Sequence, residues 1–307
     1  MDTLEMRGTG NFTKKMKTKI DYGKELRQLM AGIYTQEELD LIGKARIAIP
    51  GVGGSIGSFL LDLLARKGFE HFNLAEFDNY EFRNMSRQLF GNTTTLGCSK
   101  LEEAVSYMLK INPNIKYTKI SKLELETAED FIKDATVLAY ECDCFAPWVL
   151  SHYFCSKYKV PFVNVSRKLN VRTAVVSRIS DYKNEDLKFY ISDELFDSFG
   201  IPDKLRGEIR KMFDSGNLNK ALLDGADREH LDYKYKRRFQ DIARDFPEVG
   251  SIKKKYPNDY LKRYTDPELC FTGTALASRA VTDLVIGRKT LVNELDIFSR
   301  KQIKGYK

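Results

Sequence analysis

The sequence predicts an α/β protein with a Rossmann-like, doubly wound, mainly parallel sheet, an antiparallel extension and a helical insertion. Between residues 45 and 192, short apolar runs alternate with segments whose apolar positions recur at helical spacing. A glycine cluster, GVGGSIGS (51–58), separates the first apolar run from the first helix of this part. From 193 to 264 the strand character gives way to charged, mostly helical sequence. We therefore expect an N-terminal arm and helix (1–44), an α/β core (45–192), a basic helical insertion (193–264) and a C-terminal helix that returns to the core (265–307).

Local signals set the order of the elements. Residues 21–44 should be helical, with Thr35 as an N-cap and Glu38 completing a capping box. Gly68 closes the helix after the glycine cluster, and a later helix stops before Pro113. The expected strands are 45–50, 71–78, 115–121, 136–142 and 160–166, followed by 173–180 and 187–192, which can be antiparallel. The other expected helices are 58–68, 99–112, 127–134, 146–158, two within the insertion (204–213 and 228–246) and a small-residue-rich helix at 272–289.

Composition narrows the functional classes. The 307 residues carry a net charge of +7 and no apolar run long enough for a membrane span, and the polar N-terminus lacks a signal core, so we expect a cytoplasmic protein. Five scattered cysteines without a C-x-x-C pair argue against both a disulfide framework and a tetrahedral zinc site. Residues 201–263 contain 16 Lys and Arg against 11 Asp and Glu, a balance that suits an anionic partner such as an acidic peptide or RNA.

The glycine cluster departs by one residue from the dinucleotide-binding pattern G-x-G-x-x-G. Gly51 and Gly53 fit it, but Ile56 occupies the third position and Gly57 follows one residue late. We expect Gly57, and not residue 56, to pack closely against the turn. The cluster alone is compatible with a nicotinamide or flavin cofactor as well as with ATP.

Charged side chains follow the expected strands at the carboxyl edge of the sheet, where open α/β sheets bind ligands. Glu76 and Asp78 end the second strand, and either could hold ribose hydroxyls. Arg87 and Lys100 could neutralise the β- and γ-phosphates of a nucleotide. Asp143, after the fourth strand, offers the oxygen ligand that a phosphate-bridging Mg²⁺ needs. Together these residues suit triphosphate chemistry better than hydride transfer.

Over about 21–180 and 268–290, these motifs resemble the ubiquitin-activating-enzyme superfamily, with its ThiF- and MoeB-type adenylyltransferases and the bacterial enzymes that mature peptide antibiotics. The resemblance implies that Arg87, Lys100 and Asp143 are catalytic and that Asp143 binds Mg²⁺. It also implies a homodimer in which Arg27 reaches the partner's nucleotide. The implied ATP-binding positions are Gly51, Gly53, Gly54, Glu76, Asp78, Asn84, Arg87, Gln88, Lys100 and Arg27.

The implied reaction is attack of a carboxylate on the α-phosphate of ATP, which gives an acyl-adenylate and pyrophosphate. The family's zinc cysteines are missing, and no cysteine lies between 156 and 269, so neither zinc nor a thioester relay is expected. We favour a peptide carboxylate, as in the microcin- and pantocin-type maturation enzymes, because the basic insertion suits an acidic peptide. Three alternatives stay open: adenylation of a ubiquitin-like sulfur carrier, cyclisation of threonylcarbamoyladenosine in tRNA, and a non-enzymatic binding partner.

Overall fold

A seven-stranded sheet forms the centre of the computed structural model, which describes residues 20–167, 175–180, 193–245, 267–289 and 294–295. Its strands are β1 (Arg46–Pro50), β2 (His71–Ala75), β3 (Lys116–Ile120), β4 (Val137–Tyr140), β5 (Phe162–Arg167), β6 (Val175–Ser180) and β7 (Glu294–Leu295). They lie in the order β3-β2-β1-β4-β5-β6-β7, with β1 to β5 parallel and β6 and β7 antiparallel to their neighbours. The predicted parallel sheet with an antiparallel extension is confirmed.

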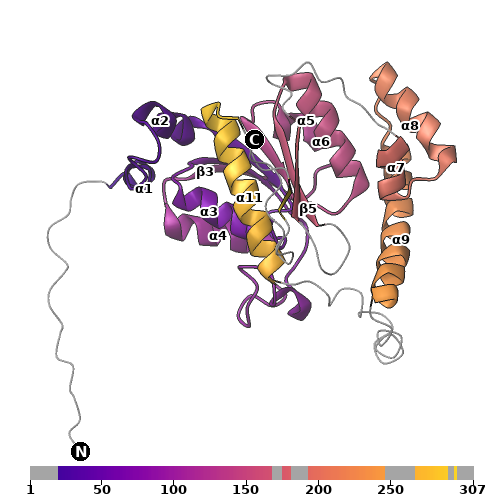
Figure 1. The fold of residues 1–307 in the computed structure, drawn as a ribbon, viewed down its shortest axis with the longest axis horizontal. Coiled ribbons are helices and arrows are strands. Elements are labelled where there is room, and N and C mark those ends of the chain that lie inside the picture. Colours follow the sequence, from indigo (N-terminus) through magenta and orange to yellow (C-terminus); the bar gives the residue numbers. More distant parts are fainter. Residues whose placement is uncertain (1–19, 168–174, 181–192, 246–266, 290–293, 296–307) are drawn as a thin grey trace, which may run out of the picture.

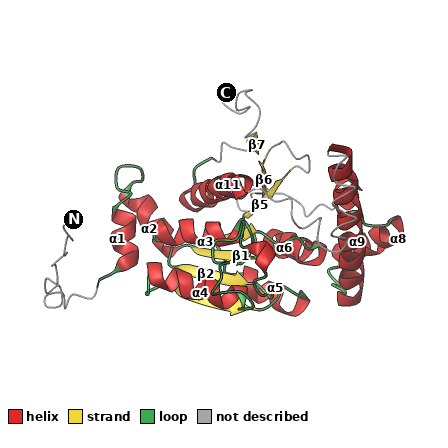
Figure 2. Cartoon of the chain, turned by 90° about the horizontal axis from the view of Figure 1, so that it is seen from below, coloured by secondary structure: helices red, strands yellow, loops and turns green. Residues whose placement is uncertain are grey.

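Helices cover both faces of the sheet, and further helices lie at both ends of the molecule. Figure 2 shows α1 and α2 at one end of the molecule and α8 and α9 at the other. The helices are α1 (Tyr22–Gln28), α2 (Gln36–Lys44), α3 (Gly57–Arg66), α4 (Lys100–Ile111), α5 (Leu125–Ile132), α6 (Phe145–Tyr158), α7 (Asp193–Phe199), α8 (Asp203–Ser215), α9 (Lys220–Asp245) and α11 (Pro267–Ile286), with a 3₁₀ turn, η1 (Phe82–Asn84).

Two hydrophobic clusters, one on each face of the sheet, form the core. Ile47 and Ile49 of β1 belong to the cluster shared with α3, α4 and α11. Ala48, between them, belongs to the cluster shared with α5 and α6. Because β1 is buried on both faces, its sequence is a continuous apolar run without polar alternation. This continuity made the strand recognisable from sequence.

The helical insertion packs on the outside of α6, as Figure 1 shows for α7, α8 and α9. Phe196 of α7, Ile209 of α8 and Leu223 of α9 are buried in the same cluster as Phe145 of α6. The expected helical character of the insertion is confirmed as far as Asp245, the last described residue of this part.

Several expected boundaries were wrong. Within residues 21–44, α2 begins after Thr35 as expected, but residues 29–35 are not helical, and Gly32 takes a left-handed φ of 97° in the turn that separates α1 from α2. The second strand ends at Ala75 and not at 78, because the Glu76 carboxylate takes the next two backbone N–H groups. The fourth strand ends at Tyr140 and not at 142. The strand expected at 187–192 and most of the arm lie outside the described residues. None of the described helices combines the length and apolarity that a bilayer crossing requires.

Candidate active site

The glycine turn between β1 and α3 is too crowded for side chains. Gly51 has a left-handed φ of 83°, donates its N–H to the carbonyl of Ala75 (2.8 Å), and a Cβ there would lie 2.6 Å from the carbonyl oxygen of Glu141. A Cβ at Gly57 would overlap the carbonyl oxygen of Gly51, so the expectation that Gly57 takes the close-packing position is confirmed. Ile56, the N-cap of α3, provides no capping side chain. The helix therefore begins with N–H groups suited to an anion.

Lys100 lies directly beside this turn. A Cβ at Gly53 would overlap Lys100 Cβ and lie 3.0 Å from Glu76 Oε2, so only glycine leaves room here. The Lys100 side chain is 6% exposed, and its Nζ lies 3.1 Å from Oδ2 of Asp78, a carboxylate that is half exposed. Its backbone N–H also donates to the Asp78 carbonyl, which ties the start of α4 to the loop after β2. A nearly buried ammonium with one ion-pair partner is well placed to meet a second anion.

Glu76 is fixed by its own backbone. Its Oε1 accepts the N–H groups of Phe77 (2.9 Å) and Asp78 (3.1 Å). Burial has the largest effect and holds the pKa of Glu76 above its usual value, although these backbone hydrogen bonds and Lys100 act in the opposite direction. The second carboxylate oxygen faces Gly53 of the glycine turn.

The segment after η1 carries the expected Arg87 and Gln88 and lies against the first turn of α3, where Leu89 N–H donates to Ser58 Oγ (3.1 Å). Asn84 is buried, and its Oδ1 accepts the Glu81 N–H (2.8 Å). Arg87 is half-buried and donates to the carbonyl of Arg83 (2.5 Å). The Oε1 atom of Gln88 is buried without a hydrogen-bond partner among the described residues. A buried acceptor without a hydrogen bond costs free energy. A donor group of a bound ligand could supply that hydrogen bond.

Asp143 stands on the other side of the turn, after β4. The loops after β1 and β4 touch, since Glu141 N–H donates to the Pro50 carbonyl (3.0 Å) and Gly51 packs on the Glu141 carbonyl. This contact is the topological switch point of the sheet, where open α/β folds bind ligands. The Asp143 side chain is exposed, and its backbone carbonyl oxygen lies 3.0 Å from Nε2 of His230 in α9.

Sequence reasoning missed three residues of this region. Burial, and then the nearby Asp143, raises the pKa of Glu141 well above its usual range, and its Oε1 has no hydrogen-bond partner in the described part of the chain. Its place directly after a buried strand could have singled it out. Asp227 and His230 contact the Asp143 loop from α9, and no motif in the sequence around them predicts these contacts.

Arg27 is not brought into the site. Its guanidinium donates to the Gly68 carbonyl (2.7 Å) and to Glu70 (2.6 Å), and the side chain is 13% exposed. Glu70 directly precedes β2, so Arg27 lies at the amino ends of the strands, opposite the glycine turn. Both contacts use Nη1 of Arg27, and the expectation that Arg27 reaches the nucleotide of a partner subunit stays a prediction of the resemblance.

The arrangement fits a nucleotide with its phosphates on the turn. Lys100 lies against Gly53 of the turn, and the loop after β4 lies against Gly51. The Gln88 oxygen, which has no hydrogen-bond partner among the described residues, belongs to the segment that packs on the first turn of α3. In the described ranges no group of three or more His, Cys, Asp or Glu side chains could hold a metal unaided. A cation here would therefore need ligand phosphates in addition to Asp143.

The ThiF family model matches residues 25–186 of the chain. Over 192 residues the chain is 22% identical to tRNA threonylcarbamoyladenosine dehydratase of Escherichia coli (strain K12), covering 58% of this chain and 68% of that protein. Over 103 residues it is 30% identical to molybdopterin-synthase adenylyltransferase of the same strain, covering 34% and 41%. A crystal structure of E. coli MccB with AMPCPP and MccA has a TM-score of 0.53 at 16% identity and covers 87% of this chain and 64% of that chain. This likeness shows a common fold.

Proposed function

The chain belongs to the ThiF family, and on that basis we propose that it is an adenylyltransferase that activates a carboxylate with ATP. A carboxylate oxygen of the substrate attacks the α-phosphorus, the bond from that phosphorus to the bridging oxygen breaks, and pyrophosphate leaves. A nucleophile then attacks the acyl carbon, and AMP departs with the former carboxylate oxygen. The observation that carries this proposal is the nearly buried Lys100 against Gly53, because a dinucleotide cradle for hydride transfer needs no such cation.

The glycine turn and the N-terminus of α3 hold the phosphates in this proposal. Gly51, Gly53 and Gly54 keep the backbone close enough for N–H groups to reach phosphate oxygens. Lys100 and Arg87 neutralise the charge that develops on the leaving pyrophosphate. The protein supplies position and charge, and no covalent intermediate with the enzyme is required.

The remaining expected residues hold the nucleoside or the loop around it. The Glu76 oxygen that faces the turn accepts a ribose hydroxyl, and Asp78 orients Lys100. Gln88 accepts a hydrogen bond from the nucleotide with the oxygen that has no partner in the described part of the chain. Asn84 acts indirectly. Its amide oxygen accepts the Glu81 N–H and so stabilises the turn that precedes Arg87.

We include Mg²⁺ in the proposal. The exposed carboxylate of Asp143 provides a hard oxygen ligand, and phosphate oxygens provide the others. When bound, the ion would neutralise phosphate charge and orient the leaving group. A homodimer is also proposed, from the sequence resemblance alone, and sedimentation would test it. In this homodimer we propose that Arg27 reaches the nucleotide of the partner subunit, which Arg27→Ala in ATP titrations of the dimer would test.

A peptide carboxylate is the favoured substrate. The match to MccB, crystallised with MccA, covers 87% of this chain, so the shared fold extends beyond the family domain into the helical insertion. The insertion has an excess of basic residues, which suits an acidic peptide. Two alternatives have named relatives in their favour: a threonylcarbamoyladenosine of tRNA, and the carboxylate of a small sulfur-carrier protein.

Isotope exchange between pyrophosphate and ATP tests both the reaction and the substrate. Peptides, a sulfur-carrier protein and tRNA are supplied in turn, and exchange should appear with one of these classes. Lys100→Ala and Asp143→Ala should abolish it, whereas Lys110→Ala, which removes an exposed lysine of the same helix α4, should leave it unchanged. Exchange that persists in Lys100→Ala would disprove the site assignment.

A further inference from the structure

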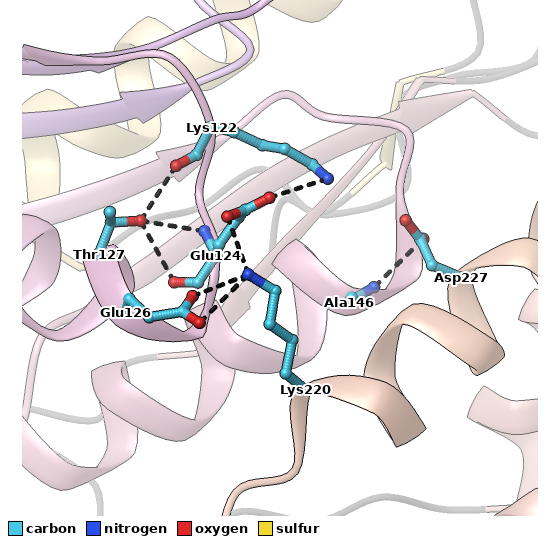
Figure 3. Close-up of polar contacts among 7 residues, drawn as sticks. All are labelled: Lys122, Glu124, Glu126, Thr127, Ala146, Lys220 and Asp227. Atoms are coloured by element: carbon cyan, nitrogen blue, oxygen red, sulfur yellow. Dashed lines mark hydrogen bonds and ion pairs between the residues drawn. The ribbon is translucent and has the colours of Figure 1, made fainter.

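Two side chains of α9 hold the backbone of the loop that carries Asp143. Asp227 and His230 are three residues apart and therefore share a face of the helix. Asp227 Oδ1 accepts the N–H groups of Phe145 (2.6 Å) and Ala146 (3.3 Å). His230 is 5% exposed, and its Nε2 lies 3.0 Å from the Asp143 carbonyl oxygen. Figure 3 shows Asp227 reaching Ala146 from α9.

The start of α6 has no local cap. Cys144 is the N-cap residue, and its side chain makes no capping hydrogen bond. Helices are usually capped by a Ser, Thr, Asp or Asn at this position. Here Asp227 caps the helix from 82 residues away in the sequence, with a carboxylate that also complements the helix dipole. The position of Asp143, directly before the N-cap, consequently depends on the position of α9.

The contacts that His230 of α9 makes are buried, whereas the ion pairs at the start of α9 are partly exposed to solvent. His230 Nδ1 lies 2.9 Å from the Phe199 carbonyl oxygen, and the Phe199 ring packs on both His230 and Phe145. At the beginning of α9, Lys220 pairs with Glu124 and Glu126 in a partly solvated cluster (Figure 3). Exposed ion pairs add little to stability. A movement of α7 and α9 would therefore be transmitted through the buried contacts to the Asp143 loop.

We propose that Asp227 and His230 are positioning residues that couple the helical insertion to nucleotide binding by setting the place of Asp143. The inference rests on the proposed function, since Asp143 is a nucleotide ligand only there. A peptide that shifts α9 would change the affinity for Mg–ATP. By linkage, Mg–ATP would change the affinity for the peptide by the same factor.

Calorimetric titration of ATP, with Mg²⁺ and with EDTA, separates positioning from mere structural support. Wild type should bind more tightly with Mg²⁺. Asp227→Ala and His230→Phe should keep the affinity in EDTA but lose about fivefold of this Mg²⁺-dependent gain, the factor equivalent to the stability that one helix cap typically contributes. Asp227→Asn should retain the gain, because an amide oxygen also accepts both N–H groups. Asp232→Ala, which removes an exposed carboxylate of the same helix, is the matched control.

The outcomes distinguish the two proposals. If wild type binds no ATP, the proposed function fails and the coupling fails with it. If Asp143→Ala loses the Mg²⁺-dependent gain while Asp227→Ala and His230→Phe keep it, only the coupling is overturned. His230→Phe retains the ring packing and decides the matter should Asp227→Ala not fold. Hydrogen exchange adds a direct readout: Mg–ATP should slow exchange in α9 of wild type but not of Asp227→Ala, and an equal response in both would overturn the coupling.

Discussion

Replacing Gly53 by alanine puts a methyl group where Lys100 lies. The new carbon would overlap Lys100 Cβ and lie 2.9 Å from its Cδ and 3.0 Å from Glu76 Oε2. Carbon atoms in contact are about 3.5–4.0 Å apart, so Lys100 must move by about 1 Å. Because Cβ is fixed to the helix backbone, the side chain cannot avoid the methyl group by rotation alone. The displacement also weakens the 3.1 Å ion pair between Lys100 and Asp78.

Two effects of Gly53→Ala follow from this geometry. Overpacking should lower the free energy of unfolding by about 1–3 kcal/mol. Loss of a charged hydrogen bond to phosphate costs about 1.5–3 kcal/mol, so the dissociation constant of ATP should rise at least about tenfold. Gly207→Ala is the control: a Cβ there meets nothing within 4 Å, and alanine in this helix should stabilise by about 0.5–1 kcal/mol. Urea unfolding measures the first effect and calorimetry the second. If both variants bind ATP equally well by calorimetry, Gly53 does not form the cradle.

Three further predictions concern stability and reactivity. Gly57→Ala should lower the urea midpoint, because its methyl overlaps the Gly51 carbonyl oxygen, a backbone atom that cannot rotate away; an unchanged midpoint would contradict the close packing. Burial lowers the pKa of Lys67 to about 8, so the unfolded state binds the additional proton between that pH and about 10.5, and the free energy of unfolding should rise with pH across this window. Lys67→Met should remove the rise, and an equal pH dependence in both proteins would refute it. Cys98 is exposed while the other cysteines are partly or fully buried, so iodoacetamide should label it first, as mass spectrometry of Cys98→Ser against wild type would show.

Features encoded by neighbouring residues were predictable from the sequence. The capping box of Thr35 and Glu38 is confirmed, with hydrogen bonds of 2.9 Å and 3.3 Å between each side chain and the other residue's backbone. The buried strand β1, the tight turn and the packing role of Gly57 follow from a short apolar run and the glycines after it. These signals predicted the succession of strands and helices along the chain and the glycine turn at which the candidate site is proposed.

Features that depend on distant contacts were not predictable. The ion pair between Arg27 and Glu70, 43 residues away in the chain, has no signal in the sequence around either residue. Asp227 looks like an ordinary charged residue of a helix surface, yet it caps α6 in the tertiary structure. His230 likewise has no metal-binding spacing, and its role is visible only once α9 is packed on α6. Each case requires knowledge of which helices become neighbours, which local patterns do not contain.

The fate of one oxygen atom tests the proposed reaction most directly. Isotope exchange between pyrophosphate and ATP first identifies the carboxylate substrate. That substrate is then prepared with ¹⁸O in its carboxylate and incubated with the enzyme and ATP. Attack on the α-phosphorus predicts AMP that carries one ¹⁸O atom and pyrophosphate that carries none. Products of ADP and phosphate, or AMP without the label, would contradict carboxylate adenylation at the site formed by the glycine turn, Lys100 and Asp143.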